Sequence, residues 1–109
     1  MSIRININDK ISAKTIILSG RTKGKNMRET LKLDELEDKE DTIEIVINKP
    51  IASFNSSYFL GLFTKSIKKY KTKEAFLEKY NFICDEYITK DIDDGIAEAL
   101  KRTNSLWSE

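Results

Sequence analysis

The chain has 109 residues, of which 39% are hydrophobic, and its 19 basic side chains nearly balance 18 acidic ones. This length suits one domain with one core, and the charge balance gives no general attraction for polyanions, so a nucleic-acid interface would need a local basic patch. One cysteine and no histidine exclude an intramolecular disulfide, a thiol–imidazole pair and a histidine metal site.

The first half of the chain predicts three strands and one helix. The isoleucines of residues 3–7 alternate with polar residues, which is the period of a strand with one buried face. A β-branched run over 15–19 ends at a glycine and predicts a second strand. Apolar residues at helical spacing predict a helix over 24–36, followed by a charged turn over 37–41. The run IEIVIN, residues 43–48, predicts a further strand, which ends at a proline.

The second half predicts three helices and one strand. Phe59, Phe63 and Ile67 recur every four residues and predict an amphipathic helix that begins at Ser56 or Ser57. The remaining predicted elements are a short helix over 73–80, a strand over 82–84 and a last helix over 89–102. Because strands alternate with helices, we expect a single α/β domain over residues 1–109, with helices packed on a small mixed sheet.

The first candidate site is the pair Ser56 and Ser57, where a strand passes into the amphipathic helix. The free amides and positive end of a helix start favour an anion, so either serine is well placed to accept a phosphoryl group. Serine is also among the preferred N-cap residues, and capping alone accounts for its presence there. The residues leave both roles open.

The second candidate is RTKGKNMR, residues 21–28, which has four cations, a glycine and no acid. A loop of this composition can hold an anion or a nucleotide phosphate with its amides while Arg21, Lys23, Lys25 and Arg28 supply positive charge. It lacks the second glycine and the lysine and hydroxyl residue of a P-loop. A solvated basic turn that balances the acidic run DELEDKED is the simpler interpretation.

Other polar clusters have simpler explanations. The lysines of KSIKKYKTK, residues 65–73, alternate with an apolar stripe, which indicates a wet helix face rather than a nucleic-acid interface. Asp91, Asp93 and Asp94 lack the spacing of a calcium loop and suit a helix start. Cys84 suits a small core residue. We find no nucleophile with an adjacent base, so we expect no catalysis, metal or cofactor. The C-terminal Leu106 and Trp107 are candidates for packing on the body or for a contact.

The span IVINKPIASFNSSYFLGLFTKSIKKY resembles the signature of STAS-like bacterial domains of unknown function, which are related to anti-sigma-factor antagonists. In both, an apolar strand leads through a short loop and a serine into an aromatic-rich helix. The earlier SGRTKGKNMR and the later FLEKYNF and DIDDGIAEAL are similar to other elements of that family, so the resemblance covers about residues 19–102.

The resemblance implies a layered βαβαβα domain that acts as a protein-interaction module. In the antagonists, a partner ATPase of the histidine-kinase-like type phosphorylates a serine at the start of this helix. By position that serine is Ser56, with Ser57 as the alternative. Antagonists carry an aspartate directly before the serine and a glycine two residues after it, where this chain has Asn55 and Tyr58.

We therefore expect a non-enzymatic regulatory module that binds another protein. The alternative is a small anion- or nucleotide-binding protein that uses the basic segment 21–28. No run of residues approaches the roughly 20 apolar positions that span a bilayer, and the first residues do not resemble a signal peptide, so we expect a cytoplasmic location.

Overall fold

A three-stranded sheet lies at the base of the structure. The computed structural model describes residues 2–107, with side-chain surroundings for residues 2–102, so the side chains of Leu106 and Trp107 lie outside the described part. The elements are β1 (Ser2–Asn6), the 3-10 helix η1 (Ile7–Lys10), β2 (Ile17–Leu18), α1 (Arg21–Leu31), α2 (Leu33–Lys39), β3 (Thr42–Val46), β4 (Ser53–Phe54), α3 (Ser56–Tyr70), α4 (Lys73–Lys79), β5 (Tyr80–Ile83) and α5 (Glu86–Trp107). This order confirms the predicted α/β class.

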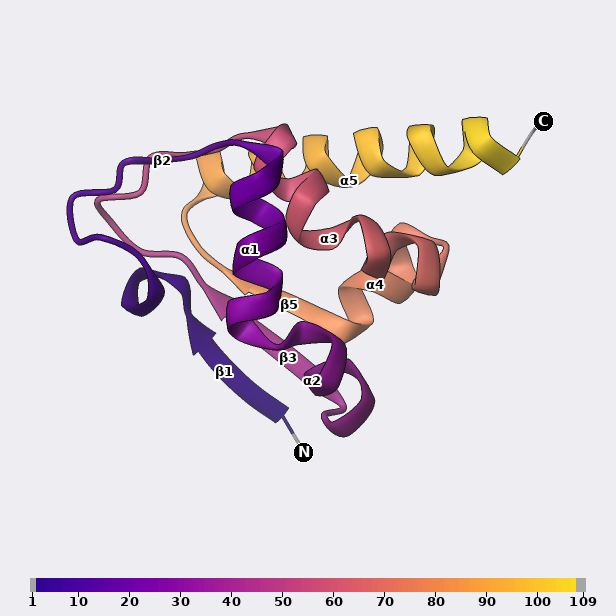
Figure 1. Cartoon of the computed structure of the whole chain (residues 1–109), viewed down its shortest axis with the longest axis horizontal. Helices are drawn as coiled ribbons and strands as arrows, with labels where there is room; N and C mark the ends of the chain where they lie inside the picture. Colours follow the sequence, from indigo (N-terminus) through magenta and orange to yellow (C-terminus); the bar gives the residue numbers. More distant parts are fainter. Residues whose placement is uncertain (1, 108–109) are drawn as a thin grey trace.

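The sheet has the order β1-β3-β5 and is parallel throughout, so the expectation of a mixed sheet was wrong. Helices α1 and α2 join β1 to β3, and α3 and α4 join β3 to β5, as Figure 1 shows. Each helical connection returns the chain to the end of the sheet at which the previous strand began. The next strand therefore runs parallel to its neighbour. The short strands β2 and β4 form a second parallel pair.

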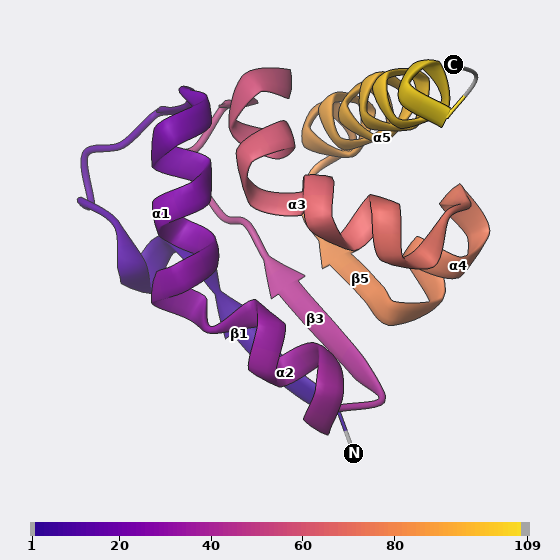
Figure 2. The same cartoon turned by 45° about the vertical axis from the view of Figure 1, so that its right-hand side comes forward.

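One face of the sheet is buried and the other carries polar residues. Ile5, Ile43 and Ile45 point into the core, and Figure 2 shows α1 and α2 in front of β1. On the opposite face Arg4 Nε lies 3.0 Å from Glu44 Oε1 of the neighbouring strand, and the Arg4 side chain is exposed. The period of two that predicted β1 and β3 therefore has its expected cause, a core on one side only.

The chain breaks the predicted helix 24–36 into two. Lys32 adopts a left-handed conformation with φ of 56°, which ends α1 and starts α2, and α2 includes most of the predicted charged turn. Leu31 and Leu33 are both buried. Because residues two apart in a helix point to different sides, one continuous helix could not bury both, and the break at Lys32 allows it.

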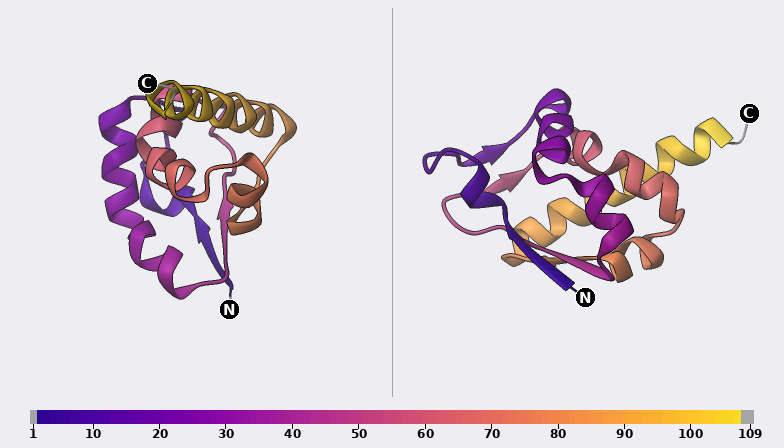
Figure 3. Two further views of the ribbon diagram at one scale, coloured as in Figure 1. Left: turned by 90° about the vertical axis from the view of Figure 1, so that its right-hand side faces the viewer. Right: turned by 60° about the horizontal axis from the view of Figure 1, so that its bottom comes forward.

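Helix α3 occupies the centre of the core, as its amphipathic pattern predicted. Phe59 and Phe63 are fully buried, and the Phe63 ring lies 5.0 Å from the Tyr80 ring and 5.4 Å from the Phe76 ring, measured between centroids. Helix α5 packs on α3 and extends beyond the other elements towards its C-terminal end (Figures 1 and 3). Gly95 permits this packing, because a Cβ there would lie 2.5 Å from the Phe59 ring.

Within residues 2–107, each helix is too short or too polar to cross a lipid bilayer.

Candidate functional site

Helices α1 and α3 begin side by side at one end of the molecule. The pairing of β2 with β4 continues into the helix starts, since the Asn55 amide donates to the Leu18 carbonyl at 2.8 Å. The two strands run parallel, so the helices that follow them also begin at the same end. We call the residues at these two starts, Gly20, Arg21 and Asn55 to Ser57, the rim.

Asn55 is the N-cap of α3, so the prediction that Ser56 or Ser57 fills this role was wrong. Asn55 has an extended backbone, and its Oδ1 accepts hydrogen bonds from the Ser57 amide and the Ser57 hydroxyl, both at 2.9 Å. An N-cap side chain must reach the amide two or three residues ahead, and asparagine does this as well as serine. The serines are therefore the first two helical residues.

The two serines have different surroundings. The Ser57 hydroxyl accepts a hydrogen bond at 3.2 Å from the amide of Gly20, in addition to its own bond to Asn55. Gly20 has φ of 96°, a conformation that favours glycine, so this contact between the helix starts depends on a specific backbone shape. Ser56 is exposed, and its hydroxyl makes no hydrogen bond to any residue between 2 and 102.

The basic segment 21–28 is not the loop that its composition predicted, because it forms most of α1. Residues 21, 25 and 28 are about one and two helical turns apart and share one face of α1, whereas residue 23 points to another side. Arg21, Lys25 and Arg28 therefore line one groove between α1 and α3, whereas Lys23 lines a separate hollow beside Leu18 and Tyr58.

The groove between α1 and α3 has a volume of about 780 Å³. Leu60, Gly61 and Thr64 of α3 form its floor. The two helix backbones nearly touch here: a Cβ on Gly24 would lie 2.2 Å from the Tyr58 carbonyl oxygen. Ser56 precedes Leu60 by four residues and therefore lies on the same side of α3, one turn beyond the end of the groove floor.

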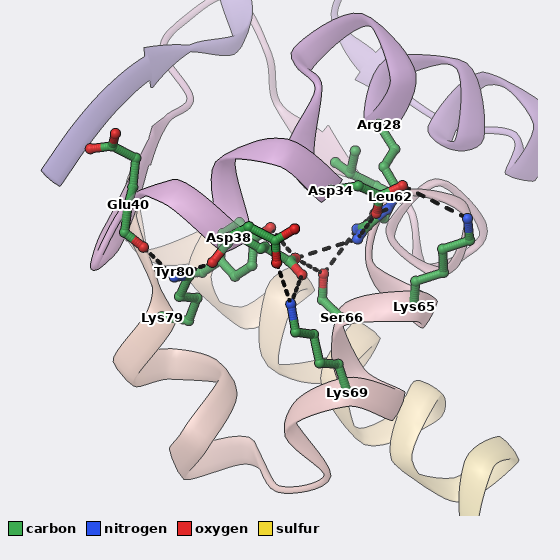
Figure 4. A network of polar contacts seen from close by, with 11 residues as sticks. Arg28, Asp34, Asp38, Glu40, Leu62, Lys65, Ser66, Lys69, Lys79 and Tyr80 are labelled. Carbon is green, nitrogen blue, oxygen red and sulfur yellow. Dashed lines mark hydrogen bonds and ion pairs between the residues drawn. The ribbon is translucent and has the colours of Figure 1, made fainter. Parts of the chain in front are cut away.

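Arg28 is held inside the protein rather than presented to a ligand. Its side chain is 7% exposed, and its Nη1 donates to the Leu62 carbonyl and to the Ser66 hydroxyl, each at 2.9 Å. Its Nη2 donates to Asp34 Oδ1 at 2.8 Å and lies 3.4 Å from Glu37 Oε2. Figure 4 shows these contacts joining α1, α2 and α3. Most of its hydrogen-bonding capacity is satisfied within the chain.

Glu37 is the buried acid that balances Arg28, and the prediction of a charged turn over 37–41 was wrong here, because Glu37 lies in α2. Its carboxylate accepts hydrogen bonds from the hydroxyls of Ser66 and Tyr80 and lies 3.5 Å from Lys69 Nζ. Burial, followed by the hydrogen bond to Glu37, raises the pKa of Tyr80 far above its usual range. Glu37 follows Leu33 by four residues, so its place on the apolar stripe of α2 was a signal that could have located it.

The other polar candidates have roles within the fold. Asp91 Oδ2 accepts from the Phe54 amide at 2.9 Å, which ties α5 to β4, and the carboxylate lies in the second turn of α5 rather than at its start. Cys84 follows β5 and is half-buried, with Sγ 3.4 Å from the Thr89 hydroxyl, and burial raises the pKa of its thiol. Lys65 and Lys73 of the lysine-rich segment are exposed and form ion pairs with acids of neighbouring helices.

The exposed hydroxyl of Ser56 at the rim and the charged groove beside it thus lie together at the surface of the α1/α3 pair. The described part of the chain holds no cluster of three carboxylate or thiol groups arranged for a metal ion. No family model, curated protein or solved structure matches the chain in a comparison with known proteins.

Proposed function

We propose that this protein is a regulatory module of the STAS-like type that carries out no catalysis and binds another protein through the rim and the adjacent surface of α3. Phosphorylation of Ser56 by a partner ATPase of the histidine-kinase-like type controls the docking. The STAS-like layering is part of this proposal. Its support is the sequence resemblance together with an order in which β1, β3 and β5 are each followed by helices.

The observation that carries the proposal is the contrast between Ser56 and Ser57. The Ser57 hydroxyl donates to Asn55 and accepts from Gly20, so its modification would remove the hydrogen bond to Asn55 and place a phosphoryl group against the junction of α1 and α3. The Ser56 hydroxyl is exposed and free of such bonds within residues 2–102. A kinase can reach it without disturbing the fold. Ser56 is therefore the acceptor in this proposal, and Ser57 is a structural residue.

The phosphoryl transfer has a simple balance. The Ser56 oxygen attacks the terminal phosphorus of ATP, the bond to the bridging oxygen breaks, ADP leaves, and the hydroxyl proton passes to a base of the kinase. The product carries between one and two negative charges at the start of α3, where the helix dipole favours them. The folded state of the module therefore tolerates the modification, and the change in charge acts on the partner that meets the rim.

The first experiment is peptide mapping by mass spectrometry of the protein purified from its native host. We expect a phosphoryl group on Ser56 and none on Ser57. The protein is then used as bait in the same host extract as wild type, as Ser56→Ala and as Ser56→Asp. A partner ATPase captured by the wild type and by Ser56→Ala, but lost with Ser56→Asp, supports the switch. Equal capture by all three, with no phosphate on Ser56, would overturn it.

A cytoplasmic location is part of the same proposal, because ATP and a soluble kinase must reach the rim. Fractionation of the native host tests this requirement, with the expected result that the protein stays in the soluble cytoplasmic fraction.

A further inference from the structure

The groove between α1 and α3 carries an excess of positive charge that the fold leaves unpaired. Four exposed cations line it without forming an ion pair to any residue between 2 and 102: Arg21, Lys25, Lys32 and Lys68. The two other basic residues of the lining, Arg28 and Lys65, both contact Asp34. Asp34 is therefore already neutralised and cannot balance the remaining four.

The acids of the groove lie away from the rim. Glu29 and Glu35 are exposed and likewise have no ion-pair partner in the described part of the chain. Glu29 follows Arg21 by two helical turns, and Glu35 belongs to α2, beyond the far end of α1. Arg21 and Lys25 thus make the end next to the rim basic, while the far end is mixed in charge.

We propose that this groove binds an acidic polypeptide segment of a partner protein. The carboxylates of the segment face Arg21 and Lys25 at the rim end, and an apolar side chain rests on the floor formed by Leu60 and Gly61. Since α1 is 11 residues long, a helical segment of about three turns would match its length. This inference rests on the proposed function, because it names the chemistry of the partner that the module docks.

The charge pattern favours a polypeptide over a nucleic acid. A phosphate backbone carries uniform negative charge, which Glu29 and Glu35 would repel at the far end of the groove. A polypeptide can place acids beside Arg21 and Lys25 and neutral or basic residues beside the two glutamates.

The position of Ser56 connects the groove with its regulation. Ser56 lies on the same side of α3 as Leu60 and Thr64, one turn before the floor begins. A phosphoryl group there adds negative charge at the rim end of the groove, so it competes with the acidic segment for the cations of that end. Phosphorylation is then expected to weaken docking through charge, without a change of fold.

The test uses a synthetic amphipathic peptide of glutamate, leucine and alanine, about three helical turns long. Its binding to the full chain is followed by fluorescence polarisation and by amide chemical-shift mapping. Two matched peptides carry glutamine or lysine in place of glutamate, and an oligonucleotide serves as a fourth ligand. We expect the acidic peptide to bind more tightly than the other three ligands and to shift the amide resonances of Leu60, Gly61 and Thr64. Its affinity should fall as salt is added.

Lys25→Glu and Lys23→Glu form a matched pair of variants. Both lysines are exposed on α1, but only Lys25 lines the groove. The double variant Arg21→Glu with Lys25→Glu should lower the affinity for the acidic peptide about tenfold, since two attractive surface pairs become repulsive ones. Lys23→Glu should leave its affinity within about twofold. Ser56→Asp and Lys25→Glu should each lower the affinity for the acidic peptide.

Three results would overturn the inference: equal weakening by Lys23→Glu and Lys25→Glu, tighter binding of the oligonucleotide, or shifts that map away from the groove. The experiment also separates this inference from the proposed function. If the groove binds the peptide but the native protein carries no phosphate on Ser56, the inference of an acidic ligand stands and the proposed switch is wrong. If Ser56 carries phosphate but the groove does not bind the peptide, the proposed switch stands and the inference of an acidic ligand is wrong.

Discussion

Gly24 of α1 and Gly61 of α3 lie against each other with no side chain between them. A Cβ on Gly61 would lie 2.1 Å from the Arg21 carbonyl oxygen, and one on Gly24 would lie 2.2 Å from the Tyr58 carbonyl oxygen. Such distances are far below van der Waals contact, so only glycine fits at both positions. This close approach sets the floor of the groove and also aligns the two helix starts that form the rim.

Gly61→Ala should destabilise the protein. Its Cβ would force α1 and α3 apart, and because the clash at 2.1 Å is with backbone, we expect a cost in the upper part of the range of about 1–3 kcal/mol for overpacking, more than the gain of about 1 kcal/mol from alanine's helix propensity. Urea unfolding should show a lower midpoint with an unchanged slope. Thr22→Ala, at an exposed position of α1, is the control and should stay within about 0.5 kcal/mol of wild type. Equal stability of the two variants would contradict the close packing.

Arg28→Met should be more damaging than a change at an exposed cation of the same helix. The substitution removes the positive charge of Arg28 beside the buried Glu37 and leaves Lys69, 3.5 Å away and about half exposed, as the remaining cation next to that carboxylate among the described residues. Breaking a buried pair from one side costs about 3–5 kcal/mol. Lys25→Met is the matched control, because Lys25 is exposed and unpaired among residues 2–102.

Urea unfolding of both variants checks the difference. The double variant Arg28→Met with Glu37→Gln should recover part of the loss, because both charges are then absent from the interior while an amide oxygen still accepts from the Ser66 and Tyr80 hydroxyls. A double variant less stable than Arg28→Met alone would show that the ion pair is not the source of the effect.

Ser57→Ala and Ser56→Ala should separate the structural serine from the exposed one. Ser57→Ala removes the contacts of its hydroxyl with Gly20 and Asn55 and should cost about 1 kcal/mol. Ser56→Ala removes no hydrogen bond within the described residues and should change stability by less than about 0.5 kcal/mol. Asn55→Ala should cost about 0.5–2 kcal/mol through loss of the N-cap.

Thermal and urea unfolding of these three variants measure the loss of stability that each substitution causes. A larger loss for Ser56→Ala than for Ser57→Ala would reverse the assignment of the two residues, and with it the choice of acceptor in the proposed switch.

The stability of the protein should fall above about pH 10, in part because of Tyr58. Burial raises the pKa of this phenol from 10.0 to about 12. Between these values the unfolded chain loses the phenolic proton while the folded protein keeps it, so rising pH favours unfolding. The contribution of Tyr58 to stability is fully present below pH 10 and is lost as the pH rises through about 12.

Urea unfolding at a series of pH values across this range, for wild type and Tyr58→Phe, measures the effect. The variant should show a flatter decline, although Tyr80 with its own raised pKa still contributes. Parallel curves would mean that Tyr58 titrates at its ordinary pKa in the folded protein.

Patterns that repeat along the chain predicted the α/β class and its main elements. The alternating isoleucines of β1 and β3 and the four-residue spacing of aromatics in α3 each report one buried face, and such a face is a local property of a strand or helix. The junction at Ser56 was found for the same reason, because the cap lies next to the apolar stripe in sequence.

Contacts between residues that are far apart in the sequence could not be predicted from such patterns. Arg28 looked like a ligand-binding cation because its partners, Glu37 and Ser66, come from α2 and α3, and a charged residue in a sequence does not reveal which distant acid will accompany it into the core. The basic segment divides between a groove and a separate hollow by its helical spacing, and the contact of Gly24 with α3 decides where that groove lies. Local periodicity reflects the geometry of a single element, whereas the identity of a buried charge pair and the position of a groove depend on how separate elements pack.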